Sequence, residues 1–174
     1  MRSFTKCCSA VLLLTTVWIA GCQDAQTPVQ PEPDVTMQAA KTPPGPTVIA
    51  ALDEAIQGEY YLQAMYARAL TDLGEDVKPF SRVARAEDRH IAALAKRYTK
   101  YQMDVPASNW SVDDFEVFDT RLDACAAAIL AETQNGAMYT TLLATELPAK
   151  VVSAFTTLQE ASLDSHLPAF TRCK

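Results

Sequence analysis

The chain has 174 residues, of which 15 are Lys or Arg, 21 are Asp or Glu and two are His, giving a formal net charge of −6. This acidic balance argues against a nucleic-acid partner and against a polybasic contact with anionic lipid headgroups. Hydrophobic residues make up 49% of the chain, which is sufficient for one domain with its own core.

The first 21 residues have the pattern of a bacterial lipoprotein signal peptide. A basic start precedes an apolar segment, 10–20, that is too short to cross a bilayer as a stable helix. The segment ends in the letters IAGC at residues 19–22, which resemble the lipobox, whose cysteine receives a diacylglycerol. We therefore predict lipidation at Cys22. An ordinary signal peptide cleaved near Gly21 and a failed membrane helix are the alternatives.

Cleavage before Cys22 also changes the charge. The removed segment carries Arg2 and Lys6 and no acidic residue, so the mature chain has a net charge near −8. Gln23 follows the lipidated cysteine, where an Asp would resemble an inner-membrane retention signal. We therefore expect a protein of the cell envelope, anchored by lipid and preferentially on the outer membrane facing the periplasm.

Residues 22–47 read as the lipidated cysteine and a tether. The segment 23–47 holds six prolines among Gln, Thr, Asp and Ala, and it has few large apolar residues. A segment of this composition cannot bury enough apolar surface to fold. The folded domain is then predicted to span 48–174.

Four helical stretches fill this domain, and no strand pattern competes with them. They are predicted at about 48–73, 79–101, 120–143 and from 148 onward, with Thr47 as the first N-cap and Gly74 after the first helix. Apolar residues recur in steps of three and four along each stretch. The predicted inward faces include Leu122, Tyr101, Val152 and Gln159 together with five polar residues that are considered next.

The connections between the stretches predict the fold class. Short links near Gly74 and Pro148 produce two antiparallel hairpins, and about 18 residues join the hairpins. Fully extended, that connection can run back along a helix of about 38 Å. One long crossover between two hairpins is the connectivity of ferritin-like bundles. We therefore predict an all-α, ferritin-like four-helix bundle.

Five polar residues fall on the predicted inward faces. Glu87 and His90 are three residues apart and share a helix face, and Glu-x-x-His is half of a metal-binding pattern found in ferritin-like bundles. Glu59 lies as far before the first turn as these two lie after it, so the three share a level. Glu132 and His166 are related in the same way across the second turn.

Each of these side chains alone has an ordinary explanation, such as a solvated carboxylate or a hydrogen-bonded core histidine. Together, five such groups at one level make a costly core without a cation. Carboxylates and imidazoles suit iron, manganese or zinc better than copper(I). We therefore predict that Glu59, Glu87, His90, Glu132 and His166 bind one or two transition-metal ions, with iron favoured over manganese and zinc.

Several short segments, in order, resemble the ferritin-like family catalogued as domain of unknown function 2202. They are Glu59-Tyr60, the letters KPFS at 78–81 and AEDRHI at 86–91, Ala131-Glu132, and SLDSHLPAF at 162–170. The resemblance implies the fold and a metal site, because relatives in the wider ferritin-like group hold two irons or manganese ions. They oxidise iron(II), reduce peroxide or activate oxygen.

The chain departs from the six-ligand pattern of these relatives at one position. A second Glu-x-x-His would place a carboxylate at 163, where this chain has Leu163. Water, Gln159, Gln63 or a single-metal site are the alternatives that would fill the gap. We expect metal to occupy the half with Glu87 more fully than the half with His166.

The cysteines and two tyrosines complete the predictions. Cys7 and Cys8 leave with the signal segment, so Cys125 and Cys173 are an even pair in an oxidising compartment. They are level across the second hairpin, and we predict a disulfide between them. Tyr66 and Tyr139 lie seven residues after Glu59 and Glu132, where they act as redox relays or as core residues with a hydroxyl partner.

These features leave the reaction open. Redox chemistry with oxygen or peroxide (oxidase, ferroxidase or peroxide reduction) is one hypothesis, and a non-catalytic metal-binding, sensing or envelope interaction module is the other. Hydrolysis at a single zinc is less favoured because no additional general base is evident. The expected partners are metal ions and, through the lipid, the membrane, but no nucleic acid. The oligomeric state is open, with a homodimer among the arrangements considered.

Overall fold

The computed structural model describes residues 43–173. The predicted signal peptide, the lipidation site at Cys22 and most of the tether lie outside the described residues. Within 43–173 the structure is helical and contains no strand, so the prediction of an all-α bundle is confirmed.

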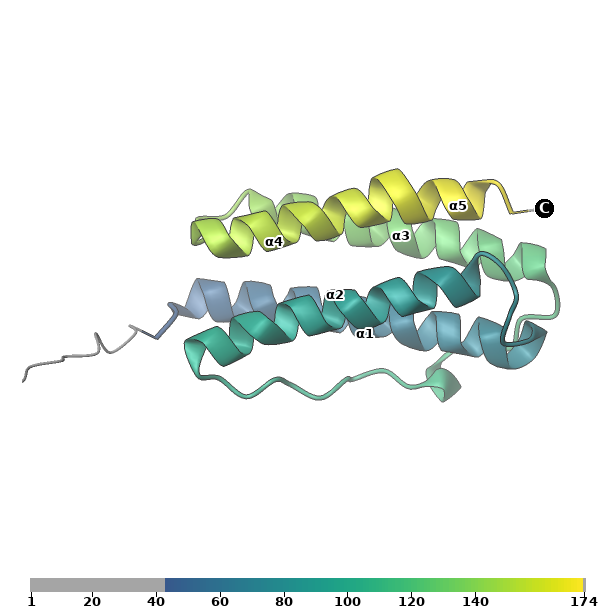
Figure 1. Cartoon of the computed structure of the whole chain (residues 1–174), viewed down its shortest axis with the longest axis horizontal. Helices are drawn as coiled ribbons and strands as arrows, with labels where there is room; N and C mark the ends of the chain where they lie inside the picture. Colours follow the sequence, from purple (N-terminus) through teal and green to yellow (C-terminus); the bar gives the residue numbers. More distant parts are fainter. Residues whose placement is uncertain (1–42, 174) are drawn as a thin grey trace, which may run out of the picture. The chain divides into compact units, whose positions relative to one another are not determined.

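Four long helical segments make up the bundle (Figure 1). The elements in chain order are α1 (Pro46–Leu73), α2 (Phe80–Tyr101), the short 3₁₀ turn η1 (Val112–Asp114), α3 (Arg121–Leu143), α4 (Ala149–Glu160), η2 (Ala161–His166) and α5 (Leu167–Thr171). The last three form one continuous helical segment, in which η2 is a stretch of π-helix. A π-turn holds an additional residue, and such bulges are frequent at functional sites.

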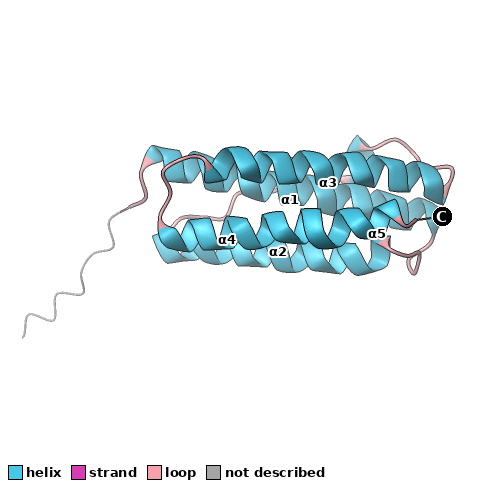
Figure 2. Cartoon of the chain, turned by 90° about the horizontal axis from the view of Figure 1, so that it is seen from above, coloured by secondary structure: helices cyan, strands magenta, loops and turns pink. Residues whose placement is uncertain are grey.

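The segments form two hairpins joined by one long connection. In Figures 1 and 2, α1 lies beside α2, and α3 lies beside the segment α4–α5. The residues between α2 and α3 run back along the bundle, as Figure 1 shows. The side chain of Gln57 on α1 bonds the backbone of Ala107 and Asn109 in this connection. The connection therefore packs along α1 rather than standing away from it.

The helix ends agree with the sequence prediction except at the start of α1. The predicted N-cap was Thr47, but α1 begins at Pro46 with Gly45 as N-cap. Proline is preorganised for the first helical position, where its missing N–H costs no hydrogen bond, so the helix begins at the proline. Gly74 ends α1 with φ of 110°, and its N–H bonds the carbonyl of Leu70. That conformation favours glycine.

Several predicted core positions were wrong, and the buried residues lie on a neighbouring face of the same helix. Leu122 is 60% exposed, and Ala124 and Cys125 are buried at that level instead. Tyr98 rather than Tyr101 is buried on α2. In α4 the buried residues are Val151, Phe155 and Leu158, where the prediction had Val152 and Gln159 beside Phe155. Two lines with helical spacing pass through Phe155, one through positions 152 and 159 and one through positions 151 and 158. The buried residues lie on the second line.

The core divides into two apolar clusters with the polar level between them. One cluster includes Leu52, Ile56 and Phe155, and the other includes Tyr66, Phe80 and Phe170. The buried charged residues Glu59, Glu87 and Glu132 belong to neither cluster. Among residues 43–173, no helix has both the length and the apolar content that crossing a membrane would require.

Candidate metal centre

Each of the four long segments contributes to one buried polar cluster. Glu59 comes from α1, Glu87 and His90 from α2, Glu132 from α3 and His166 from the end of η2. The three glutamates are fully buried, and the side chains of His90 and His166 are 14% and 8% exposed. The structure therefore brings all five predicted residues to one level in the middle of the bundle.

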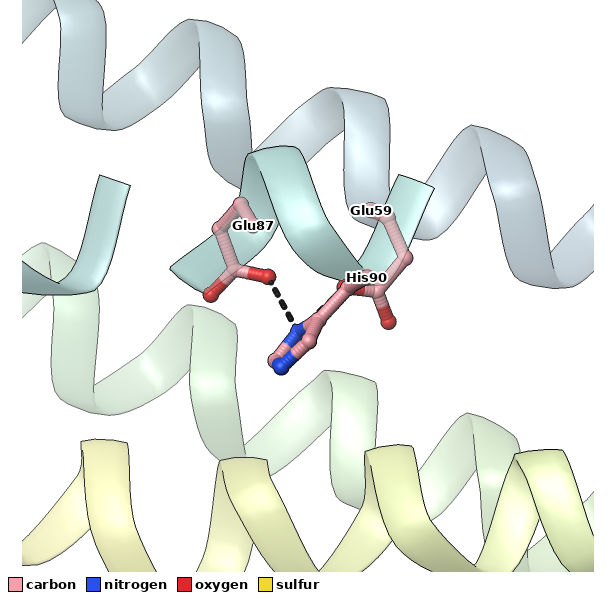
Figure 3. A group of neighbouring side chains, drawn as sticks. All are labelled: Glu59, Glu87 and His90. Carbon is pink, nitrogen blue, oxygen red and sulfur yellow. Dashed lines mark hydrogen bonds and ion pairs between the residues drawn. The ribbon is translucent and has the colours of Figure 1, made fainter. Parts of the chain in front are cut away.

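The first group consists of Glu59, Glu87 and His90. The ring atom His90 Nδ1 lies 2.8 Å from Glu87 Oε2 and 3.1 Å from Glu59 Oε2. Figure 3 shows the imidazole of His90 turned toward both carboxylates, which come from two neighbouring helices. One ligand atom from each residue lies within 4.8 Å of the other two.

The second group consists of Glu87, Glu132 and His166. The ring atom His166 Nδ1 lies 3.1 Å from Glu87 Oε1 and 3.2 Å from Glu132 Oε1, and this group also meets the 4.8 Å spacing. The rings of His90 and His166 are stacked, with centroids 5.3 Å apart. From the sequence pattern, Glu87 was predicted to belong only to the half of the site that contains Glu59 and His90. In the structure its two oxygens face the two histidines, so it is common to both groups.

The carboxylates are also held from outside the cluster. Tyr66 on α1 donates to Glu132 Oε1 on α3, and Tyr139 on α3 donates to Glu59 Oε1 on α1 at 2.6 Å. Each tyrosine therefore positions the carboxylate of the opposite hairpin. Both tyrosines have the core position with a hydroxyl partner that was one of the two predicted roles.

Sequence reasoning missed one polar residue of this shell. Asn135 is buried, and its side-chain amide donates to Glu59 Oε1 at 3.3 Å and to Ser162 Oγ at 2.9 Å. The helical spacing of the predicted helix at 120–143 places Gly136 on the inward face. Asn135 is its neighbour in the sequence and was therefore not predicted to face the core. An asparagine in the interior of an apolar helix was the available signal, because buried amides require partners.

Some buried polar atoms of the cluster lack a hydrogen-bond partner among the described residues. They are Glu87 Oε1, Glu132 Oε2 and His166 Nδ1. The distances from His166 Nδ1 to Glu87 and Glu132 are those of an ion pair, but neither contact has hydrogen-bond geometry. Unsatisfied buried groups of this kind are costly. All three atoms are of the type that binds a transition-metal ion, so the donor set fits a metal.

The pKa values of the cluster residues in the protein without metal also indicate that the buried carboxylates need a positive counter-charge. Burial raises the pKa of Glu59 to about 7. Burial would lower the pKa of His90, but hydrogen bonds to Glu59 and Glu87 raise it to about 10. The pKa of His166 rises to about 9, because its contacts with Glu132 and Glu87 outweigh burial. Near neutral pH, protons on both histidines therefore balance the buried carboxylates, a role that a cation would take over.

Glu87 responds in the opposite direction. Burial by itself would raise its pKa, but the neighbouring rings of His166 and His90 hold the pKa of this carboxyl below its usual range. The carboxylate shared by the two groups therefore stays ionised near neutral pH. A shared, ionised carboxylate is suited to bridge two cations.

Position 163, where the six-ligand pattern has a carboxylate, is a leucine that packs against α3. Leu163 lies against Gly136, where a Cβ added to the glycine would overlap the leucine side chain. Neither predicted substitute reaches the centre, because Gln63 bonds Asp88 and Gln159 bonds Thr140 and the carbonyl of Gly136. In this structure both side chains are therefore engaged in other hydrogen bonds.

Cys125 and Cys173 are joined by a disulfide, with their Cα atoms 6.2 Å apart. The separation lies within the range that a disulfide requires. The bond connects α3 to the end of the α5 segment and closes a span of 48 residues. Because Cys125 and Cys173 are the two cysteines within residues 43–173 and both are engaged in this bond, no thiol of this part of the chain is available to the polar cluster.

The fold and the site together define an all-helical bundle with a buried carboxylate and histidine cluster that could bind a metal. Comparison of the chain with protein-family models, curated proteins and solved structures found no match. The function must therefore be inferred from the geometry of the cluster.

Proposed function

We propose that this protein binds one or two transition-metal ions in a ferritin-like bundle, at Glu59, Glu87, His90, Glu132 and His166. One observation carries the proposal: two groups of three ligand-type residues share the buried carboxylate of Glu87, whose two oxygens face the two histidines. A cluster of three buried carboxylates would otherwise require protons as its only counter-charge.

The donor set favours iron or manganese. Carboxylate oxygens and imidazole nitrogens suit these ions and zinc, whereas copper(I) prefers sulfur. Each group offers three protein residues, which leaves coordination positions open to small molecules at an ion that prefers six ligands. A closed structural zinc site would have four protein ligands. These considerations favour iron first, then manganese.

When bound, such ions would supply redox chemistry with oxygen or peroxide, including oxidation of iron(II). The chain itself supplies the enclosure and the positioning. Tyr66 and Tyr139 hold Glu132 and Glu59 at fixed places, and Asn135 fixes Glu59 from a third direction. The apolar clusters on either side limit water at the centre.

A non-catalytic metal-binding or sensing module, or an envelope interaction domain with a residual site, is the second candidate. Leu163 favours it, because a leucine that packs against Gly136 stands at the sequence position where the six-ligand pattern has a second carboxylate. An assay of iron(II) oxidation by the metal-loaded protein, measured as oxygen consumption, distinguishes an enzyme from a binding module. Turnover above that of free iron(II) supports an enzyme, and stable loading without turnover supports the binding module.

Metal content and melting temperature test the site itself. Elemental analysis of protein loaded with iron(II) or manganese(II) should give one or two ions per chain. Binding to the folded state alone raises the melting temperature, by roughly 10 °C when the free ion is at a thousand times its dissociation constant. Glu87→Gln should abolish the rise and lower the content, because it weakens both groups.

Glu54→Gln is the matched control. Glu54 is an exposed carboxylate on α1, one turn and one residue from Glu59, and its substitution should leave loading unchanged. Circular dichroism establishes that each variant is folded. Should Glu87→Gln fail to fold, Glu132→Gln takes its place. Equal metal content in all proteins, or none in any, would refute the proposal.

We also propose that Cys22 is lipidated and anchors this domain in the cell envelope, outer membrane favoured. Support comes from the IAGC sequence at 19–22, and from the Pro-rich residues between it and the start of α1 at Pro46. Cys22→Ser should release the protein from the membrane fraction or leave it unprocessed. A processed, acylated Cys22→Ser protein that remained with the membrane would contradict this proposal.

A further inference from the structure

A second feature of the bundle lies between α2 and the segment η2–α5. A cleft of about 690 Å³ is lined there by residues of both elements, including His90 and His166. These two elements face one another in Figure 1. Its volume is in the range of small-molecule sites in proteins. The cleft therefore leads from solvent to the two histidines of the metal centre.

The lining of this cleft is basic, although the chain as a whole is acidic. Lys78, Arg82, Arg89 and Arg172 line it, and Asp164 is the sole acidic residue among the lining side chains. All four cations are exposed, and none forms a salt bridge within residues 43–173. Lys78 bonds a hydroxyl, and Arg89 bonds a backbone carbonyl. Four cationic side chains gathered without carboxylate partners produce a positive potential, which a concave surface focuses.

The chemistry of these groups defines what they would bind. Guanidinium groups match the planar geometry of carboxylates and the tetrahedral oxygens of phosphates, and they bind both through paired hydrogen bonds. Cations on both sides of the cleft, three on or just before α2 and Arg172 just after α5, favour a ligand with more than one anionic group. The volume exceeds what a single inorganic ion fills.

We propose that the cleft between α2 and η2–α5 binds a small organic polyanion, with two or three carboxylate or phosphate groups, through Lys78, Arg82, Arg89 and Arg172. The binding site stands without the metal. Its role as the substrate site of the metal centre rests on the function proposed above, because His90 and His166 belong to both the cleft and the centre.

Citrate is a suitable probe, used on metal-free protein because it also chelates metals. Isothermal titration calorimetry should give a dissociation constant below about 1 mM at low ionic strength. Arg82→Gln and Arg89→Gln should each weaken binding about tenfold, the value of a charge-assisted hydrogen bond. Raising the salt concentration to about 150 mM should weaken the binding of citrate to the wild-type protein, because exposed charges are screened.

Arg85→Gln is the matched control. Arg85 is an exposed arginine of the same helix, between the two tested residues, but it does not line the cleft. Its substitution should leave the citrate affinity unchanged. Equal affinities in all three variants would show non-specific attraction only, and absence of measurable binding at low salt would equally overturn the proposal.

Two further measurements separate this proposal from the metal site. Amide chemical shifts should change on citrate addition in residues 78–90 and 161–172, and changes elsewhere alone would refute the location. Arg82→Gln should still load metal as the wild type does. Glu87→Gln should still bind citrate when metal-free, so either proposal can fail while the other stands.

Discussion

The two hairpins of the bundle contribute to the site in parallel, but not equally. Each supplies a buried glutamate on its first helix, a tyrosine seven residues later and a histidine on its second helix. The first hairpin has Glu87 three residues before its histidine, and the second has Leu163 there. The helix of the first is regular, whereas a π-helical stretch ends at the histidine of the second.

The difference shows how one carboxylate can serve two histidines. Because Glu87 directs one oxygen to each ring, the second hairpin keeps a group of three ligand-type residues without a carboxylate at 163. The released position packs Leu163 against Gly136 instead. Both groups thus offer three ligand-type residues, and the expectation that metal occupies the half with Glu87 more fully stays a prediction. Four experiments test this comparison, beginning with the one that should change stability most.

Raising the pH should act on both halves, and on the second half first. The pKa of His166 is about 9 and that of His90 about 10. Both exceed the unfolded value of about 6.5, so their contribution to stability is complete below that pH and is lost as the pH rises through 9 and 10. Glu59, with its pKa raised to about 7, acts in the same direction at lower pH.

Losing both imidazolium charges leaves buried carboxylates unpaired, which costs about 3–5 kcal/mol. Urea unfolding of metal-free protein between pH 6.5 and 10 measures the loss, and histidine ring signals in NMR give the order of titration. A constant free energy of unfolding over that range would contradict the prediction. Titration of His90 before His166 would reverse the comparison of the halves.

Removing the disulfide should affect the second hairpin most. Cys125→Ser with Cys173→Ser opens a closed span of 48 residues, which chain entropy values at about 4 kcal/mol, with measured losses often smaller. Chemical denaturation measures the change. Hydrogen exchange should increase most in α3 and α5, and an equal increase in α1 and α2 would argue against independent halves.

Single-ligand substitutions should weaken one group each. Glu59→Gln removes a charge from the group with His90, and Glu132→Gln from the group with His166. Each should lower the affinity of one ion by about 10–100-fold, or roughly 1.4–2.8 kcal/mol, while the other ion is retained. Metal titration followed by elemental analysis gives the stoichiometry. If either change removed all metal, the groups would not be separable and a single ion would be indicated.

Gly136→Ala should disturb the packing that replaces the sixth ligand. Alanine favours a helix by up to about 1 kcal/mol, but here its Cβ overlaps Leu163. We expect a net loss of about 1–2 kcal/mol in thermal unfolding. Gly58→Ala is the comparison on α1, because its Cβ would come 3.0 Å from Asn135 Oδ1 and from the flexible end of Met138, a wider spacing than the overlap with Leu163 at Gly136. Equal effects of the two substitutions would show that Leu163 is not closely packed.

The helices and the common level of the site residues follow from the sequence without knowledge of the fold. Helical periodicity of 3.6 residues placed Glu59, Glu87, Glu132 and His166 on inward faces. Equal distances from the two turns placed Cys125 opposite Cys173, because antiparallel helices advance by the same rise per residue. These relations are local or depend on chain connectivity alone, which is why they could be predicted.

How the groups meet across the bundle is evident from the three-dimensional packing and not from the sequence pattern. The sharing of Glu87, the crossed contacts of Tyr66 and Tyr139, and the role of Asn135 depend on side-chain rotamers and on the lateral packing of the helices. The basic cleft also requires α2 and η2–α5 to face one another. Periodicity gives the face of a residue but not which oxygen of a carboxylate meets which partner, since that choice depends on neighbours that are distant in the sequence.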